Sequence, residues 1–565
     1  METYDHIIIG AGPAGVQMGY FFQRRGMSYV ILEKGSQGAT FFTNYPRNRR
    51  LISVNKVHCG SSNIENVLRF DWNSYLPDHD DKNPLLFKEY SSDYYPQAEC
   101  LVSYTNNFID SHSLNIHYNA DVTTVEKNAD GDFKVKVGDK LYLCNKLIVA
   151  VGLLPNKMPN VTMAPVPNGR ALYTYETMPL DPELYKNKRV VIIGGGNAAF
   201  EVANYLNAYT NTITMYGADK FGWRTHYPGH IRSVNMQIID SYYLKLNVVF
   251  NWCSSDNFRN DSSYHSRMDT LISGQIWHSA DFVIYACGFH PNLQFLQNLN
   301  VTLGQSRFPL LTPWYESVSC PNLYFAGSLT QNEDYKKGTS AFIHGFRYNC
   351  RFLLQYLLKS YSCKECFTIN EIAVNLLRRL NTSSALLHRF DYYCDTMLFL
   401  PHKYLYIEHI PVSHIHHLDS LSKVLDVPIE PGSIFIQSLL GYDKRNPFMS
   451  SFKQPQTGSY FGVSDKSVFI HPVLNVYIVS EEKKAVLIHT LHLSEEALNT
   501  FSRVEGHYGI VLKLLHLLSS LRSSAILHTP SKVERAVQQF HSCLFMYFKH
   551  DEYSPVSVDE IGPNF

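Results

Sequence analysis

YDHIIIGAGPAGVQMGYFFQRRGMSYVILEK, from Tyr4 to Lys34, is the stretch that decides the fold of this chain. Its apolar run His6–Ile9 predicts a buried parallel strand, and the residues from about Pro13 to Arg25 predict a helix. The next apolar run, Tyr29–Leu32, predicts a second strand that ends on an acidic residue. The stretch therefore indicates a strand–turn–helix–strand unit, the beginning of a doubly wound α/β fold.

The turn of this unit carries the pattern Gly10-x-Gly12-x-x-Gly15. Its glycines allow a tight turn, a close approach to a pyrophosphate and close helix packing, while Glu33 is placed to bind a ribose. Because all parts occur in the right order, we expect a dinucleotide site rather than a glycine-rich turn without a ligand. Its expected residues are Gly10, Gly12, Pro13, Ala14, Gly15, Glu33 and Lys34.

A second unit of this kind begins at Lys188 and carries Gly194-x-Gly196-x-x-Ala199, in which alanine is an accepted third residue. We expect Gly194, Gly196, Asn197 and Ala199 to hold a nicotinamide nucleotide. The following strand ends on Tyr216 without an acid, and Lys220 and Arg224 come soon after. These features favour NADPH over NADH. The alternative is that this half keeps the fold without binding nicotinamide.

Three strand-to-glycine exits complete the pattern. They are Leu147–Gly152, Asp281–Gly288 and Asn322–Gly327, and the last predicts a strand that returns to the first sheet. We expect two Rossmann-like domains: a three-layer FAD domain of residues 1–155 and 293–358, and an inserted NAD(P) domain of residues 156–292. An α+β region of residues 359–565 follows. We place Gly152, Gly327 and the start of a helix over Ser340–Arg347, including Phe342, near the flavin, and Val122 near the adenine.

Other polar stretches could face a ring cofactor. The loop Thr40–Arg47 could lie along the pyrophosphate and the flavin edge, with Arg47 as its contact, or it could be a basic surface loop. Ser53–Lys56, which contains Asn55, and Asp71–Ser74 each combine polar residues, and the second adds an aromatic. Either could line the ring. No side chain is assigned as a catalytic acid or base.

Composition excludes several classes. Lysine plus arginine equals aspartate plus glutamate at 50 each, so net charge does not favour nucleic acid. No apolar stretch approaches the ~20 residues of a membrane-spanning helix. The chain enters its first strand almost at once, which leaves no room for a signal peptide, and its end carries no retrieval tetrapeptide. Taken literally, these ends predict a soluble intracellular chain, or a mature or incomplete form of a longer one.

The 11 cysteines are scattered, so wholesale disulfide bonding is not expected. Cys363-Lys-Glu-Cys366 could be a redox dithiol, but we expect two surface thiols because the pair follows a helix rather than opening one. No metal site is expected, because the histidines between His402 and His417 lack an acidic or cysteine partner. In the C-terminal third we expect helices at 367–380, 384–398, 506–521 and 531–548 and strands at 433–438 and 467–478, with no assignable chemistry.

The chain resembles flavoproteins of the flavin monooxygenase and thioredoxin reductase class, with two dinucleotide sites. More closely, it is similar to the family of the endoplasmic-reticulum flavoprotein associated with degradation. The similar segments include GAGPAG, TFFTNYPRNRRLISVNK, FDWNS, YYP, GGGNAAFE, THYPG and AFIHGFRY, and more weakly NEIAVNLLRRLN and HPVLNVY. The resemblance implies bound FAD, NADPH use and a role in the lumen of the endoplasmic reticulum in disposing of misfolded glycoproteins. Lectin, ubiquitin-ligase adaptor and thioredoxin-like partners are implied with it.

The chain departs from both reference mechanisms. Tyr173 stands where the monooxygenase pattern Phe-x-Gly-x-x-x-His would place its histidine, and no CxxC pair lies between residues 190 and 290. The leading hypothesis is an FAD-dependent oxidoreductase that NADPH reduces and that passes electrons to a small molecule or disulfide. The alternatives are an N- or S-monooxygenase and a flavin-stabilised adaptor with vestigial redox activity.

Overall fold

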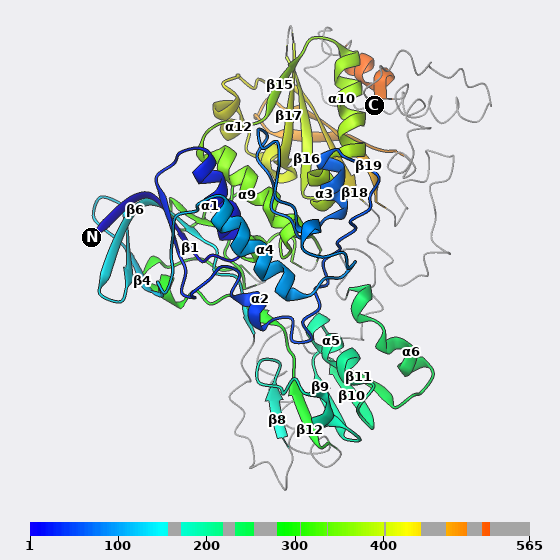
Figure 1. The fold of residues 1–565 in the computed structure, drawn as a ribbon. Coiled ribbons are helices and arrows are strands. Elements are labelled where there is room, and N and C mark those ends of the chain that lie inside the picture. Colours follow the sequence, from blue (N-terminus) through cyan, green and yellow to red (C-terminus); the bar gives the residue numbers. More distant parts are fainter. Residues whose placement is uncertain are drawn as a thin grey trace, which may run out of the picture.

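The computed structural model describes residues 1–155, 171–217, 232–252, 280–304, 307–335, 337–400, 403–441, 470–493 and 511–519. Three β-sheets and a two-stranded ribbon organise these residues. In Figure 1 the second sheet lies below the first and the third lies above it. Helix α9 (Ile343–Leu357) contacts α1 of the first part and α11 and β17 of the third. The predicted α/β class, with two Rossmann-like units and an α+β region, is confirmed.

The first sheet has the order β3-β2-β1-β6-β5-β4, with β14 on the free part of β6. Strands β1, β2, β3, β6 and β14 run parallel, whereas β4, β5 and the start of β6 form an antiparallel meander. Ile8 packs on the helical face, while Ile7 and Ile9 pack on the other. This burial on both faces explains the unbroken apolar run. The strands are Glu2–Ile9, Tyr29–Leu32, Ile116–His117, Val122–Lys127, Phe133–Val137, Lys140–Val149 and Leu323–Phe325.

The second sheet is entirely parallel, with the order β11-β10-β9-β12-β8. A short antiparallel ribbon of β7 (Leu154–Pro155) and β13 (Phe289–His290) lies where the chain passes between the two sheets. The strands β8 to β12 are Ala171–Thr174, Arg189–Ile193, Thr212–Gly217, Val248–Trp252 and Phe282–Tyr285. The helices of these two parts, α1 to α6, are Pro13–Arg24, Phe41–Asn44, Ile64–Phe70, Ala98–Ser111, Asn197–Leu206 and Ile238–Tyr243. Short 3-10 turns η1, η2, η3, η6 and η7 cover Phe87–Glu89, Pro182–Tyr185, Ser233–Asn235, Gln294–Leu299 and Gly327–Thr330.

The third sheet is antiparallel, with the order β15-β17-β16-β18-β19-β20. Its strands are Cys363–Cys366, Tyr404–Pro411, Tyr393–Phe399, Ile434–Gly441, His471–Val479 and Ala485–His492 in that spatial order. Helices α10, α11 and α12 are Ile369–Thr382, Ser384–His388 and Leu418–Leu425, the 3-10 turn η8 is Val412–His416, and residues 511–519 are helical. The strand expected over 433–438 is confirmed. The part of the strand over 467–478 that the structure describes is β19, and residues 531–548 lie outside the description.

The helix expected over 384–398 is wrong in its second half. Helix α11 ends at His388, and Tyr393–Phe399 is the inner strand β16, buried along its whole length. Asp391 adopts a left-handed backbone, φ +62°, which no helix interior accommodates. The leucines had suggested a helical period, but the aromatic and branched residues of this run pack between β17 and β18.

The expectation of two surface thiols is also wrong for one of them. Cys363 is exposed, whereas Cys366 is 3% exposed and packs in the core of the third sheet. Both belong to strand β15, so three strand steps of about 3.3 Å each separate them. Two cysteines this far apart cannot form a disulfide without moving the backbone. The structure therefore argues against the redox interpretation of this CxxC.

The third part is fastened to the first by helix α3, which is blue in Figure 1 and lies beside α10. Arg69 donates to the carbonyl oxygens of Leu380 and Asn381 at the end of α10. One turn earlier, Glu65 Oε2 accepts from the backbone N–H of Ser384 at 3.0 Å, at the start of α11. The i, i+4 pair on α3 therefore binds both sides of the α10–α11 corner, each charge at the helix end that favours it.

No helix among the described residues is both long enough and apolar enough to traverse a lipid bilayer.

Three buried histidines lie near this junction: His344, His388 and His409, each at most 5% exposed. Burial is the main cause that holds the pKa of each well below the ordinary value of 6.5, and nearby arginines lower it further. They are therefore neutral in the folded protein at neutral pH. Once the chain unfolds, each would take up a proton below about pH 6.5.

We predict that stability falls steeply on acidification. The unfolded state binds more protons than the folded state below pH 6.5, so each histidine costs roughly 1.4 kcal/mol per pH unit below that value. Denaturant unfolding at pH 7.5, 6.5 and 5.5 measures this slope. H388Q should reduce the slope by about one proton. A stability that stays constant down to pH 5.5 would contradict the prediction.

Candidate functional site

The first glycine turn is shaped by two carbonyl contacts. Gly10 has φ +102°, and a methyl group on it would lie 2.8 Å from the carbonyl oxygen of Ala150. A methyl group on Gly15 would lie 1.9 Å from the carbonyl oxygen of Gly10. Gly12 differs, because a methyl group there would meet nothing closer than Ala150 O at 4.0 Å. Gly12 also has an ordinary extended backbone, so packing does not explain its lack of a side chain, and open space for a ligand does.

Glu33 lies at the end of β2, beside this turn, and is 6% exposed. Its Oε2 accepts from the backbone N–H of Ala11 at 2.6 Å, and its Oε1 accepts from that of Gly35 at 2.7 Å. A carboxylate offers about four acceptor positions, so capacity for ribose hydroxyls remains. Pro13 and Ala14 form the first turn of α1, and Lys34 is exposed beside Glu33.

The second glycine turn repeats the design of the first. Gly194 has φ +142°, and a methyl group on it would lie 2.2 Å from the carbonyl oxygen of Ala286. Gly196 would admit a methyl group with nothing within 4 Å, and it caps helix α5 without a side-chain hydrogen bond. Ala199 is buried, facing the Gly194 turn. Beside its parallel strands, each of the first two sheets thus carries a turn in which packing requires the first glycine and leaves open space at the second.

Asn197 joins the second turn to the first part of the molecule. Its Oδ1 accepts from the backbone N–H of Arg232 at 2.8 Å and from Asn235 Nδ2 at 3.0 Å. The guanidinium of Arg232 lies 4.7 Å from the centre of the Trp72 ring. Trp72 in turn stacks near His344, with 4.1 Å between ring centres. A cation therefore lies between the α5 start and the aromatic groups at the α9 start; Lys220 and Arg224 are outside the described residues.

Arg47 forms hydrogen bonds with the second part of the molecule. Its Nη2 donates to the carbonyl oxygen of Met178 at 2.8 Å, and its backbone N–H donates to Tyr175 OH at 3.1 Å, both in the second part. Tyr175 OH also donates to Glu201 Oε1 at 2.8 Å. Burial raises the pKa of Glu201 to about 7. The loop is a junction between the two nucleotide-type units, and Glu201 is a junction residue that the sequence did not reveal within the second fingerprint.

The observed start of α9 lies three residues after the expected helix start at Ser340. The helix begins at Ile343, with Phe342 as its cap, and Ser340 precedes it. Ser340 is 1% exposed; its backbone N–H donates to Asp334 Oδ2 at 3.0 Å and its Oγ accepts from Asn349 Nδ2 at 3.1 Å. A methyl group on Gly327 would lie 2.7 Å from the Ala14 side chain, so the end of β14 touches the first turn of α1.

The two polar clusters of the first part meet in space. Asn55 and Asp71 form a β-bridge, and Trp72 N–H donates to Val54 O at 3.0 Å. Asn55 Nδ2 donates to Ser91 O and Asp93 O, and Asn73 Nδ2 donates to Val54 O, which fixes both amide orientations. Both side-chain oxygens are then buried and accept no hydrogen bond from any described residue. Two unpaired buried acceptors beside Trp72 suit a ligand that offers N–H donors.

The remaining predicted positions lie at the edges of the first sheet. Val122 is the first residue of β4, half-buried, and Gly152 follows β6 with φ +69°. The structure thus gathers the first turn, Glu33, Gly327 and the α9 start along one edge. It places Arg47 at the junction with the part that carries the second turn.

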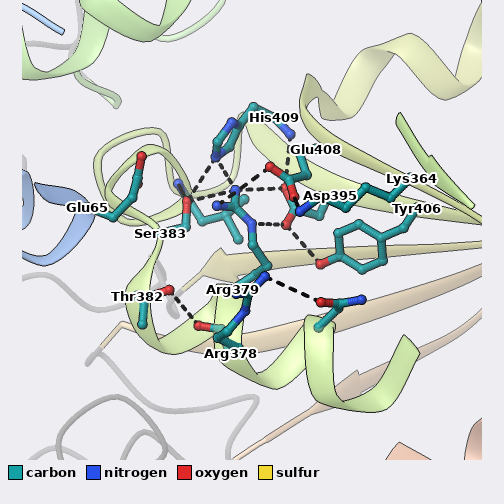
Figure 2. Close-up of polar contacts among 12 residues, drawn as sticks. Glu65, Lys364, Arg378, Arg379, Thr382, Ser383, Asp395, Tyr406, Glu408 and His409 are labelled. Atoms are coloured by element: carbon teal, nitrogen blue, oxygen red, sulfur yellow. Dashed lines mark hydrogen bonds and ion pairs between the residues drawn. The ribbon is translucent and has the colours of Figure 1, made fainter. Parts of the chain in front are cut away.

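The largest polar cluster of the third part has a structural role (Figure 2). Arg379 Nε donates to Asp395 Oδ2 at 2.9 Å, and its Nη2 bonds His409 Nε2 and Ser383 Oγ. Asp395 accepts from the backbone N–H of His409, not from its imidazole, and Ser383 caps α11. These residues do not form a nucleophile triad, because no carboxylate orients the imidazole. Among the described residues no group of histidine, cysteine and acidic side chains could hold a metal ion.

Comparison with known proteins agrees with this geometry. Residues 7–327 match the family model of pyridine nucleotide-disulphide oxidoreductases. The chain is 30% identical to the FAD-dependent oxidoreductase domain-containing protein 2 of Mus musculus over 84% of its own length and 76% of that protein. It is also 30% identical to the protein of that name from Danio rerio, over 74% and 69% of the two lengths. A flavin-containing monooxygenase structure from Stenotrophomonas maltophilia aligns with 18% identity and a TM-score of 0.47, over 63% of this chain and 99% of that one.

The matched region begins in β1 and ends at Gly327, so it contains both glycine turns, the junction between them and the returning strand. The mouse and zebrafish relatives extend the similarity to most of the chain. This chain therefore belongs to the pyridine nucleotide-disulphide oxidoreductase family and is an FAD-dependent oxidoreductase.

Proposed function

We propose that this oxidoreductase binds NADPH at the second glycine turn, uses it to reduce FAD held at the first, and passes the electrons to a disulfide or other small-molecule acceptor. The observation that carries the proposal is the repeated turn design, one beside the parallel strands of each of the first two sheets. In both turns the exit-strand carbonyl excludes a side chain at the first glycine, and the second glycine is open.

The residues of the first turn fit FAD. The open space at Gly12 lies at the start of α1, where backbone N–H groups and the helix dipole favour a pyrophosphate. Glu33 keeps acceptor capacity for a ribose. Asn55 Oδ1 and Asn73 Oδ1 are buried acceptors without a protein donor among the described residues, which suits a ring that carries N–H groups. The start of α9 would favour negative charge on such a ring.

The residues after the second turn favour NADPH. Strand β10 ends on Tyr216 and Gly217, so no carboxylate stands at its end where it would repel a 2′-phosphate. Arg232 is held at the α5 start through Asn197, which adds a cation near the expected phosphates. Lys220 and Arg224 support this proposal from sequence alone.

When bound, FAD supplies the electron-carrying chemistry, accepting a hydride and releasing electrons to an acceptor. The protein's own part is to bind, to orient and to exclude water. Trp72 and His344 lie together on one side of the start of α9. The hydrogen bonds among Arg47, Tyr175 and Glu201 link the first and second parts of the molecule. All cysteines in the described residues are free thiols, and Cys363 and Cys366 lie too far apart along a strand to form a dithiol. An acceptor outside the described part of the chain fits these facts.

We further propose, from the family resemblance, that the acceptor is met in the lumen of the endoplasmic reticulum, where the protein would act in the degradation of misfolded glycoproteins. A lectin, a ubiquitin-ligase adaptor and a thioredoxin-like co-chaperone are the partners of this proposal. The thioredoxin-like partner suits a flavoprotein that delivers electrons to disulfides.

We predict that anaerobic NADPH bleaches the flavin absorbance near ~450 nm in the purified protein. The variant G196V should keep its FAD, resist bleaching by NADPH and still bleach with dithionite. Its valine would enter open space at an extended backbone position, so the fold should persist. A wild-type spectrum that NADPH leaves unchanged would contradict the proposal and favour the adaptor alternative.

We also predict that G12V yields a folded but colourless protein. Valine fits the backbone of Gly12, and its side chain would fill the space expected for the pyrophosphate, so FAD affinity should fall at least about tenfold, or ~1.4 kcal/mol. G10V is the matched contrast, because its side chain would collide with Ala150 O and should prevent folding. Flavin content and circular dichroism distinguish the two. Wild-type flavin content in G12V would place the cofactor elsewhere.

A further inference from the structure

The segment between Gly327 and α9 joins two parts of the flavin site. Its first residue touches Ala14 in the first turn of α1, and its last residue, Phe342, caps α9. Any contact that holds this segment in place therefore also sets the distance between the pyrophosphate end and the ring end of the flavin site. The segment is buried at Thr330, Asp334, Thr339 and Ser340, each at most 5% exposed.

A continuous relay of hydrogen bonds runs through the segment. Asp334 Oδ2 accepts from the backbone N–H of Ser340 at 3.0 Å. Asn349 Nδ2, on α9, donates to Ser340 Oγ at 3.1 Å and to Thr330 Oγ1 at 2.9 Å. Thr330 Oγ1 donates to the carbonyl oxygen of Gly327 at 2.8 Å. Asp334 is thus connected to Gly327 through buried polar groups alone.

The third part of the molecule holds this segment at two points. Arg389 Nη1 donates to Asp334 Oδ2 at 2.6 Å, and the two side chains are 4% and 1% exposed. Thr339 Oγ1 donates to the carbonyl oxygen of His388. His388 and Arg389 are consecutive, at the end of α11. The third part, to which the sequence assigned no chemistry, therefore holds the segment that lies next to the flavin site.

Arg389 and Asp334 form an ion pair with one hydrogen bond rather than a bidentate pair with two. Asp334 Oδ1 and Arg389 Nε are both buried without a hydrogen-bond partner in the described structure. Arg389 is kept in place by the rings of Tyr392 and Tyr393, 5.4 and 5.3 Å from its guanidinium. Beside the pair lies a small hollow, with room for about one water molecule, lined by Glu333, Asp334 and Arg389 among others. A small cation could enter this hollow if the arginine were removed.

We propose that Arg389 is a positioning residue of the flavin site: through Asp334 it holds residues 327–342 in the conformation that receives the flavin, so the third part of the chain completes that site. The inference rests on the FAD binding of the proposed function. It does not require NADPH to be the reductant, nor any particular acceptor.

The charges of Arg389 and Asp334 predict opposite effects on the midpoint potential of the flavin, which structural support alone would not produce. Reduction adds negative charge to a flavin, and Ser340, whose backbone N–H donates to Asp334, lies just before the start of α9. Removing Arg389 leaves the carboxylate of Asp334 uncompensated and should lower the midpoint potential of the flavin. Removing the charge of Asp334 leaves the guanidinium uncompensated and should raise it. Loss of packing alone would shift both variants in the same direction.

The experiment compares full-length wild type with R389M, D334N, the double variant and R378M, reducing each with dithionite and a reference dye. Arg378 is an exposed arginine on α10 whose Nη2 donates to Asn375, so R378M is the matched control. We expect FAD to bind about tenfold more weakly to R389M and D334N, with midpoint potentials that move down and up respectively. The double variant should return towards the wild-type potential, and R378M should leave both quantities unchanged.

If R389M does not fold, R389K takes its place, because lysine keeps one charged contact with Asp334 and should keep most of the FAD affinity. For R389A, millimolar guanidinium should restore FAD affinity by entering the hollow, whereas sodium should not. Wild-type affinity and potential in both R389M and D334N would overturn the inference. So would potentials that shift in the same direction. Failure of NADPH to reduce a flavin-loaded wild type would count against the proposed function only.

Discussion

Two backbone carbonyls, those of Ala150 and Ala286, constrain the two nucleotide units. Each ends a parallel strand and lies against the first glycine of a neighbouring turn, where a methyl group would come within 2.8 Å and 2.2 Å respectively. Because a side chain is excluded there, the exit strand can pair directly with the first strand and the helix can begin at once. The second glycine of each turn, where a methyl group would meet nothing closer than 4.0 Å, lies at the start of a helix, where an anionic ligand is favoured.

The third part of the chain meets the first through charged groups rather than through apolar surface alone. Within the first part, Arg347, fully buried on α9, donates to the carbonyl oxygens of Leu68, Asp71 and Ser74, at and just beyond the end of α3. Arg69 of α3 does the same for the end of α10. Burial alone would raise the pKa of Glu65, but Arg351, Arg379 and the bonds from Ser384 lower it. The partial negative charge at the C-terminal ends of helices therefore compensates much of the positive charge of these buried arginines.

The sequence was sufficient for the elements whose signals are local. The glycine turns, Glu33, the hairpin before Gly152 and the returning strand at Leu323–Phe325 could be read because their residue types and spacing are dictated within about thirty residues. The interactions between distant segments were not readable. Arg47 bonds Met178, and Arg389 bonds Asp334, across 131 and 55 residues. A single sequence offers each arginine many possible partners.

Some local errors have a tertiary cause as well. Ser340 was expected to begin a helix, but its backbone N–H is taken by Asp334, which delays the helix to Ile343. Cys366 was expected to be a surface thiol because the pair follows a helix rather than opening one, yet a strand turns alternate residues inward. The run 393–399 looked helical until its position between two strands was known. In each case burial against a distant segment overrode the local preference.

The buried arginines also limit how the third part can dock. Arg69 and Arg389 are each at most 9% exposed, and each bonds a carbonyl or carboxylate of the other part, so only the docked structure supplies their partners. An unpaired buried charge costs roughly 3–5 kcal/mol, so a partly docked arrangement that leaves both of them unpaired is strongly disfavoured. Docking is then close to all-or-none. The segment 327–342 is consequently either held by His388 and Arg389 or released entirely, and the order of the flavin site is linked to the folding of a region that contains neither glycine turn.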